Sequence, residues 1–189
     1  MKTYFISLIT SMFLLALGTP QNAQAQSFEK GLLSISPGIN FGGLGFYGNG
    51  SGIPVIASGE FAILDYVGVG PYAGFANYSW GSGASKYSYR FISFGVRGDF
   101  HYAAFLEEIL DMDMNSDKVD LYMALVFGYQ TTTYSGPEGS IFRGVYGNRG
   151  TSGLIVGGRY YFSKNLAVFG EAGRSIYGAL NVGITLRLK

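Results

Sequence analysis

The segment ALNVGITLRLK (Ala179–Lys189) decides the fold, because its polarity alternates at every position. Side chains of a β-strand point in turn to opposite faces of the sheet. One face of this segment is wholly aliphatic and consists of Leu180, Val182, Ile184, Leu186 and Leu188. The other face is small, polar or basic and consists of Asn181, Gly183, Thr185, Arg187 and Lys189. The segment therefore predicts an amphipathic strand, of the kind found in soluble sandwiches and in membrane barrels.

Similar alternation recurs along the chain. The predicted strands are Gly31–Phe41, Ile53–Leu64, Val67–Trp80, Tyr87–Tyr102, Val119–Gln130, Leu154–Phe162, Leu166–Arg174 and Ala179–Lys189. Loop-like composition separates them at Gly42–Gly52, Trp80–Ser85, Thr131–Ser152 and Ser175–Gly178, and tight turns are expected at Asp65 and Ser163–Asn165. Short connections that alternate with longer ones are typical of membrane barrels. The pattern predicts an all-β fold, an eight-stranded antiparallel up-and-down transmembrane β-barrel.

The N-terminus has the three parts of a secretory signal peptide. Lys2 is followed by an apolar run from Tyr4 to Leu17 and by Ala23-Gln24-Ala25. We therefore expect residues 1–25 to be a cleaved signal peptide and residues 26–189 to form the barrel domain. The apolar run is shorter than the roughly 20 residues of a transmembrane anchor. Removal of Lys2 takes the formal net charge from +1 to zero, which leaves no basic surplus to attract nucleic acid.

The composition indicates which strand face points inward. A soluble barrel would bury its apolar face and coat its exterior with charges. Here only 13% of the residues are charged, and the polar faces consist mainly of Gly, Ala, Ser and Tyr. Such side chains suit a narrow lumen better than a soluble exterior, so we expect the apolar faces to meet lipid.

The inward faces are predicted to hold an ion-pair network. The same alternation turns three acidic and three arginine side chains into the lumen: Glu60, Asp99, Glu171, Arg97, Arg159 and Arg187. A guanidinium in a dry lumen requires a partner, and its fork geometry matches a carboxylate. The alternative is that some of these side chains lie near strand ends, in water, without pairing.

Aromatic residues gather near the predicted strand ends. Such residues form girdles at both membrane interfaces of known barrels, although the strand propensity of aromatic residues accounts for the pattern as well. The expected outer girdle is Tyr78, Trp80, Tyr87, Tyr89, Tyr129 and Tyr134, and the inner one is Tyr66, Phe100, Tyr102 and Phe162.

Motifs for chemistry are weak. Gly43–Gly48 matches G-x-G-x-x-G, but no helix follows it. Phe105–Lys118 is acidic, with a short helical period, and is interpreted as an elaborated turn. Its Asp111, Asp113 and Asn115 match the start of a calcium loop whose glycine and final glutamate are absent. We expect a lumenal or interfacial hydrogen bond for His101, and no catalytic residue, cofactor or metal site.

The last strand also carries a short motif. Asn181–Leu188 is similar to the polar-x-Gly-x-x-hydrophobic-x-hydrophobic signal that the barrel assembly machinery reads in small outer-membrane proteins of the OmpA/OmpX/OmpW type. The resemblance implies that Asn181, Gly183, Leu186 and Leu188 form an assembly signal. Members of that family commonly end on an aromatic residue, whereas this chain ends on Lys189.

The sequence thus leads to an expected function in the bacterial outer membrane. We expect a non-enzymatic barrel with a side-chain-filled lumen that acts as a structural or surface-binding protein through its external loops. Its expected partners are outer-membrane lipid and the barrel assembly machinery, and the sequence identifies no external ligand. The alternative is a narrow porin-like transport barrel for a small or apolar solute. A soluble β-barrel is the third possibility.

Overall fold

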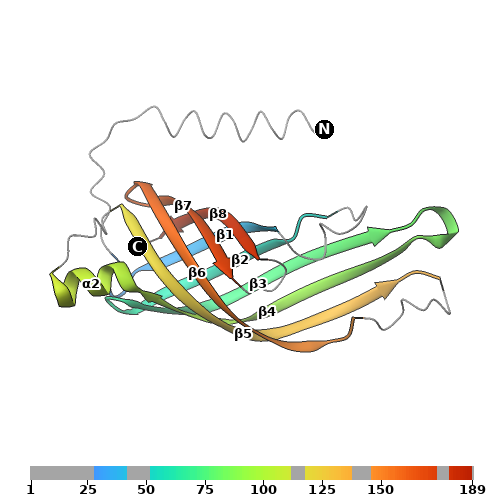
Figure 1. Cartoon of the computed structure of the whole chain (residues 1–189), viewed down its shortest axis with the longest axis horizontal. Helices are drawn as coiled ribbons and strands as arrows, with labels where there is room; N and C mark the ends of the chain where they lie inside the picture. The colour runs from blue at the N-terminus through green and yellow to red at the C-terminus, as the bar shows by residue number, and fades with distance from the viewer. Residues whose placement is uncertain (1–27, 42–51, 112–117, 138–145, 174–178, 189) are drawn as a thin grey trace.

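The protein folds as a closed antiparallel β-barrel, as predicted. The structure, a computed structural model, describes residues 28–41, 52–111, 118–137, 146–173 and 179–188. Within these residues, strands that are neighbours in sequence pair with one another all round the barrel (Figure 1). The strands are β1 (Leu33–Phe41), β2 (Val55–Leu64), β3 (Val67–Trp80), β4 (Tyr87–His101), β5 (Val119–Ser135), β6 (Arg149–Ser163), β7 (Leu166–Gly173) and β8 (Leu180–Arg187). The predicted signal peptide lies outside the described residues.

The first and last strands close the barrel. β1 pairs with β8 from Ser34 opposite Arg187 to Phe41 opposite Leu180. The start of β1 and the end of β8 therefore lie at the same end of the barrel, which we call the terminal end. The other end is the distal end. Both predicted tight turns lie at the terminal end, between β2 and β3 and between β6 and β7.

The barrel wall is much taller on one side than on the other. The strands β3 to β6 have 14 to 17 residues, whereas β1, β2, β7 and β8 have 8 to 10. The surplus length projects beyond the distal rim (Figure 1). We call this part, residues 76–80, 87–93, 130–135 and 149–152, the distal extension. It shortens the predicted loop Thr131–Ser152, because β5 continues to Ser135 and β6 starts at Arg149.

The outer surface of the barrel body is apolar. Val96, Phe94, Phe127 and Leu154 are each more than half exposed, at 53–60%. Buried charged residues occupy the alternate positions of the same strands. This is the opposite of a soluble barrel, whose apolar side chains fill the interior.

A helix elaborates the connection between β4 and β5. It is α2 (Tyr102–Leu110), which starts directly after β4, three residues before the predicted acidic turn. Phe105 anchors it to the terminal end by contacting the rings of Tyr66 and Phe100, each at 5.4 Å between centroids. The part of the turn at 112–117, including Asp113 and Asn115, lies outside the described residues. Among the helices described, none has the length and apolarity needed to cross a membrane.

Candidate functional site

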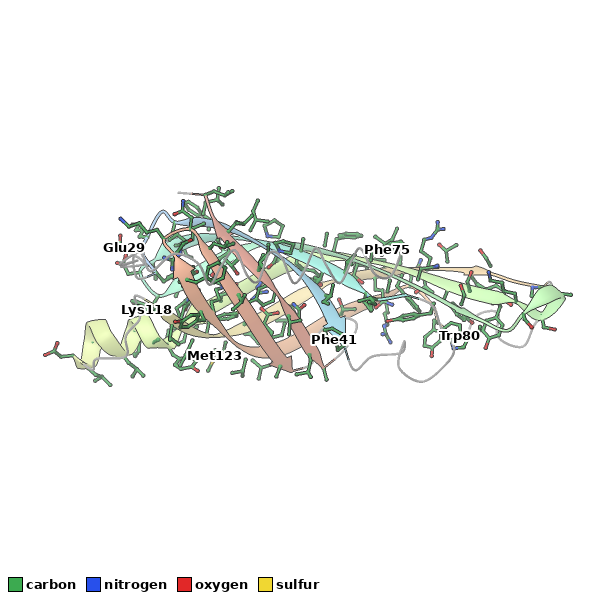
Figure 2. The ribbon with its side chains drawn as sticks, turned by 90° about the horizontal axis from the view of Figure 1, so that it is seen from above. Glu29, Phe41, Phe75, Trp80, Lys118 and Met123 are labelled. Carbon is green, nitrogen blue, oxygen red and sulfur yellow. The ribbon has the colours of Figure 1, made fainter. Side chains whose placement is uncertain are left out.

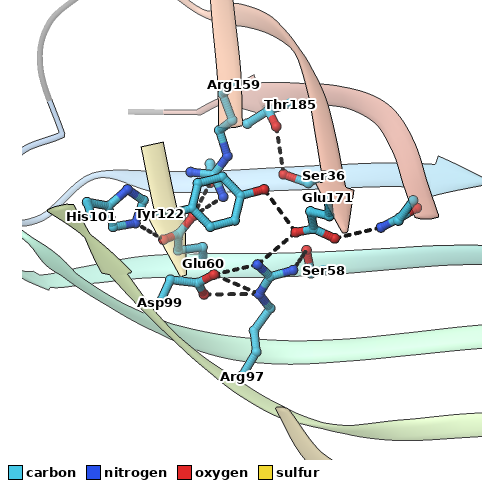
Figure 3. A network of polar contacts seen from close by, with 12 residues as sticks. Ser36, Ser58, Glu60, Arg97, Asp99, His101, Tyr122, Arg159, Glu171 and Thr185 are labelled. Carbon is cyan, nitrogen blue, oxygen red and sulfur yellow. Dashed lines mark hydrogen bonds and ion pairs between the residues drawn. The ribbon is translucent and has the colours of Figure 1, made fainter. Parts of the chain in front are cut away.

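The barrel interior contains a buried polar network, to which β1, β2, β4, β5, β6, β7 and β8 contribute (Figure 3). Alternation turns every second side chain of each strand into the lumen. All six predicted network residues are buried there, at 1–6% exposure: Glu60, Arg97, Asp99, Arg159, Glu171 and Arg187. Buried charges of this kind are costly unless they are paired and hydrogen-bonded.

Arg97 is the centre of one half of the network. Its Nε donates to both carboxylate oxygens of Asp99 at 3.0 Å, and its Nη2 also donates to Asp99. Nη2 makes a second ion pair with Glu171 Oε1 at 2.9 Å. Nη1 donates to the hydroxyl of Ser58 at 3.4 Å. One guanidinium thus joins β2, β4 and β7 across the lumen.

Arg159 and His101 form the other half. Arg159 Nη2 lies 2.6 Å from Glu60 Oε2, and its Nη1 lies 3.2 Å from Asp120 Oδ2. His101 bridges the same two carboxylates, with Nε2 2.6 Å from Glu60 Oε1 and Nδ1 2.7 Å from Asp120 Oδ1. A neutral imidazole has one N–H, whereas an imidazolium has two. Two carboxylate partners therefore fit the imidazolium form of His101.

Tyr122 connects the two halves. Its ring centroid lies 4.5 Å from Arg159 Cζ and 5.8 Å from Arg97 Cζ, which are cation–π distances. Its hydroxyl donates to Glu171 Oε1 at 2.9 Å. Asn181 Nδ2 donates to the other oxygen of Glu171 at 2.8 Å. These contacts join the two halves into one continuous network.

Arg187 contacts an aromatic ring. Its Cζ lies 3.7 Å from the ring centroid of Tyr161. The sequence analysis expected a lumenal or interfacial hydrogen bond for His101 but did not include it, Asp120 or Tyr122 in the ion-pair network. The available signal was the inward register of Asp120 and Tyr122 on their strand, and the position of His101 two residues beyond Asp99 on β4.

The predicted assembly-signal residues lie on both faces of β8. Asn181 is buried in the lumen, whereas Leu186 and Leu188 are 39% and 55% exposed on the outer surface. Gly183 lies opposite Gly38 of β1. A methyl group at Gly183 would lie 2.2 Å from the backbone oxygen of Pro37, so the close approach of β8 to β1 requires glycine there.

Two further groups of side chains lie in the lumen beside the network. At the terminal end, Phe28 and Leu32 pack on Ala62 and Ala104. Farther along β1 and β8, the ring of Phe169 covers Gly38, whose added methyl group would lie 2.8 Å from Phe169 Cζ. Aromatic side chains therefore accompany the charged network inside the barrel.

The distal extension carries an aromatic cluster on its inner face. Tyr78 and Tyr89 were predicted to lie in the outer girdle, but they are 1% and 2% exposed and pack with Ala76 and Phe91. Half-buried rings surround them, namely Trp80, Tyr87, Tyr134 and Tyr146. The prediction for Tyr78 and Tyr89 was wrong because β3 and β4 run past the barrel rim, so their inward positions still face the barrel axis.

Within the described part of the chain, no group of three or more His, Asp or Glu side chains could hold a metal ion. The charged groups of the network are already used by one another, so the arrangement is suited to holding the barrel wall together. The inner face of the distal extension has rings and polar groups near the rim, which is suited to binding.

The solved structures that are similar to this chain include small β-barrels. No protein-family model and no curated protein sequence matches the chain. Among solved structures, it is similar to the N-terminal β-barrel domain of Pseudomonas aeruginosa OprF, with 11% identity and a TM-score of 0.47 over 86% of this chain and 100% of that chain. It is also similar to Ail, the attachment invasion locus protein of Yersinia pestis, with 19% identity and a TM-score of 0.38 over 84% and 95% of the two chains. A de novo designed transmembrane β-barrel matches with 14% identity and a TM-score of 0.46 over 86% and 100%.

These likenesses assign this chain no family and no role. Its barrel architecture rests on its own strand pairing.

Proposed function

We propose that this protein is a non-enzymatic outer-membrane barrel that is closed to solutes and displays its distal extension for binding outside the cell. Residues 1–25 would direct export and then be removed. The terminal end would face the periplasm, because its two-residue turns match the short periplasmic turns of such barrels. The observation that carries the proposal is the apolar outer surface around an ion-paired interior.

The outer surface supports a membrane location because its apolar band ends abruptly. The last apolar row toward the distal end includes Phe75 and Ile92. In the next row of outward-facing residues toward the distal end, Asn77 of β3 lies opposite Arg90 of β4, which lies opposite Thr133 of β5. Along β5 the outward apolar positions run from Val119 to Tyr129, about 26 Å for a strand rise of about 3.4 Å and a tilt of about 40°, and this matches a band of about 25 Å.

The interior argues against free diffusion of solutes. An eight-stranded barrel is just wide enough for side chains to fill it. The pairs of Arg97 with Glu171 and of Arg159 with Glu60 cross this space, and Tyr122 occupies the gap between the two guanidiniums. A solute would have to separate buried charges, at several kcal/mol for each pair. This favours a structural or surface-binding role over the narrow transport barrel.

The distal extension is the part available to external partners. It starts at the edge of the apolar band and continues through the polar row that contains Arg90, so everything from that row outward would stand above the bilayer. In Figure 2, Phe75 lies on the barrel body and Trp80 lies farther along the extension. Lipid would contact the apolar band, and the barrel assembly machinery would recognise β8 through Asn181, Gly183, Leu186 and Leu188.

Planar-bilayer conductance tests the closed state. Purified refolded protein should show no steady channels, while a known porin reconstituted in the same way supplies the positive control. Heat-modifiable migration on a gel would show that the silent protein is a folded barrel. Steady channels from folded protein would overturn the proposal in favour of the transport alternative.

A further inference from the structure

We propose that the inner face of the distal extension is a binding site for an acidic sugar, a pyranose that carries a carboxylate. This inference rests on the proposed function, in which the distal extension is exposed outside the cell. The site consists of a polar row on the inner face, at the base of the distal extension, and the aromatic cluster beyond it.

The polar row crosses three strands. Ser93 of β4 lies opposite Gln130 of β5, which lies opposite Arg149 of β6. Ser93 and Gln130 are buried, at 0% and 3% exposure. Ser93 Oγ and Gln130 Oε1 nevertheless have no hydrogen-bond partner within the part of the chain that the structure describes. Buried polar atoms are almost always paired, so a row that contains two such atoms indicates a ligand that supplies the missing hydrogen bonds.

The aromatic cluster forms the wall above this row. Trp80 stacks on Tyr87 with 5.6 Å between ring centroids and 18° between ring planes. Tyr134 lies 5.2 Å from Tyr89, and its buried hydroxyl also has no partner within the described residues. Trp80, Tyr87 and Tyr134 are only half buried, so parts of their rings remain accessible. Rings with polar tips offer an apolar face for stacking together with hydrogen-bonding groups.

The charged side chains near the site favour an acidic ligand. In the described residues of the distal extension and the hairpin that joins β3 to β4, the charged side chains are Lys86, Arg90 and Arg149, and all are basic. Arg149 is the one on the inner face, and it is exposed. It lies on the part of β6 that extends beyond the pairing with β7, which starts at Ile155 opposite Gly173. A guanidinium at an open strand edge is suited to bidentate binding of a carboxylate.

These features define one ligand chemistry. The rings require an apolar face, the polar row requires hydroxyl groups, and Arg149 requires an anion. A pyranose acid has all of these, whereas an acyl chain lacks the hydroxyl groups and a simple anion lacks the apolar face. The sugar could belong to a glycolipid of the same membrane or to a soluble glycan.

The chain contains a single tryptophan, Trp80, so its fluorescence reports directly on the site. The mature protein in detergent is titrated with trigalacturonic acid and, as a matched neutral probe, with its fully methyl-esterified form. We expect a saturable fluorescence change with the acid alone. No saturable change, or equal binding of the ester, would overturn the inference.

Two variants and a matched control locate the binding. Arg149→Gln should raise the Kd about tenfold, as expected for loss of one charge-assisted contact. Gln130→Leu should also weaken binding while keeping or raising the thermal midpoint, since it removes an unpaired buried oxygen. Arg90→Gln removes the same charge from the outer face of the extension and should leave the Kd unchanged. Equal weakening by Arg90→Gln and Arg149→Gln would mean non-specific attraction and would overturn the site.

Nanodiscs with and without an acidic glycolipid distinguish a membrane-borne sugar from a soluble glycan. If the natural ligand is the glycolipid, the glycolipid in the nanodisc should compete with trigalacturonic acid. If the natural ligand is a soluble glycan, it should not. If the protein is a folded, heat-modifiable barrel that conducts no ions and does not bind trigalacturonic acid, this inference is wrong and the proposed function still holds. Steady channels would instead defeat the proposed function.

Discussion

The ring of Phe28 lies flat on the imidazole of His101, with 3.5 Å between the ring centroids and 13° between the ring planes. Phe28 is 3% exposed and His101 is fully buried. The chain before β1 therefore seals the terminal end directly over the His101 bridge between Glu60 and Asp120. Since Phe28 would be the third residue after the expected cleavage at Ala25, the mature N-terminus itself would supply this seal.

Removing the seal should expose His101. We expect Phe28→Ala to speed the reaction of the imidazole with diethyl pyrocarbonate. Loss of the stacked ring would admit water and the reagent, which attacks a ring nitrogen whenever that nitrogen transiently leaves its carboxylate partner. The chain has one histidine, so mass spectrometry of the peptide that carries it separates this reaction from the reactions of lysines and of the N-terminal amine. Phe94→Ala, which removes a lipid-facing ring that is 53% exposed, is the control and should leave the rate unchanged. Equal rates in Phe28→Ala and the native protein would show that Phe28 does not seal His101.

The ion pairs of Arg159 should contribute strongly to stability. Arg159→Met leaves Glu60 and Asp120 buried with one partner fewer each, and this should lower the free energy of unfolding by about 3–5 kcal/mol. Urea unfolding in lipid vesicles measures the change. Arg90→Met removes an exposed arginine and should change the stability by less than about 0.5 kcal/mol. A similar small effect for Arg159→Met would contradict the account of the network.

The two glycines where β8 meets β1 should differ in their tolerance of a methyl group. At Gly38 the methyl group would meet the side chains of Phe169 and Asn181, each at 2.8 Å, at a cost of about 1–3 kcal/mol. Adding Phe169→Leu should recover part of this loss. At Gly183 the methyl group would meet Phe169 Cε1 at 2.6 Å and also the backbone oxygen of Pro37 at 2.2 Å, so Gly183→Ala should be more destabilising.

Heat-modifiable gel migration gives the thermal midpoints of the four variants, namely Gly38→Ala and Gly183→Ala, each with and without Phe169→Leu. Phe169→Leu should not rescue Gly183→Ala, because the backbone contact remains. Rescue of both glycine variants to the same extent would mean that Phe169 alone sets the requirement for glycine.

The membrane boundary can be mapped with single cysteines, since the chain has none of its own. In whole cells, a membrane-impermeant maleimide should label Arg90→Cys, which lies in the first polar row. It should not label Phe94→Cys in the apolar band or Lys164→Cys in the turn between β6 and β7. Labelling of Lys164→Cys together with protection of Arg90→Cys would reverse the proposed orientation.

Much of the fold could be predicted because alternation is a local property. The inward positions of Glu60, Arg97 and Glu171 follow from counting by two along each strand. Strand ends were less predictable. The polar composition of Thr131–Ser152 indicated a loop, but polar residues on both faces of β5 and β6 are compatible with strand where the sheet stands beyond the apolar band.

The partners within the lumen could not be predicted in the same way. Arg97 pairs with Glu171, which is 74 residues away in the chain, and His101 pairs with Glu60 rather than with the nearer Asp99. Which inward side chains meet depends on the stagger and tilt of the closed barrel, and these are set by pairing along the whole circumference.

The sequence by itself determined the strands, their two faces and the polarity of the lumen, because each follows from a period of two within single segments. Only the tertiary structure decided that Tyr122 lies between Arg97 and Arg159, and that the wall of β3 to β6 rises past the short strands with its rings turned inward. The physical reason is that closure fixes the relative heights of residues on different strands, and no segment contains that information alone.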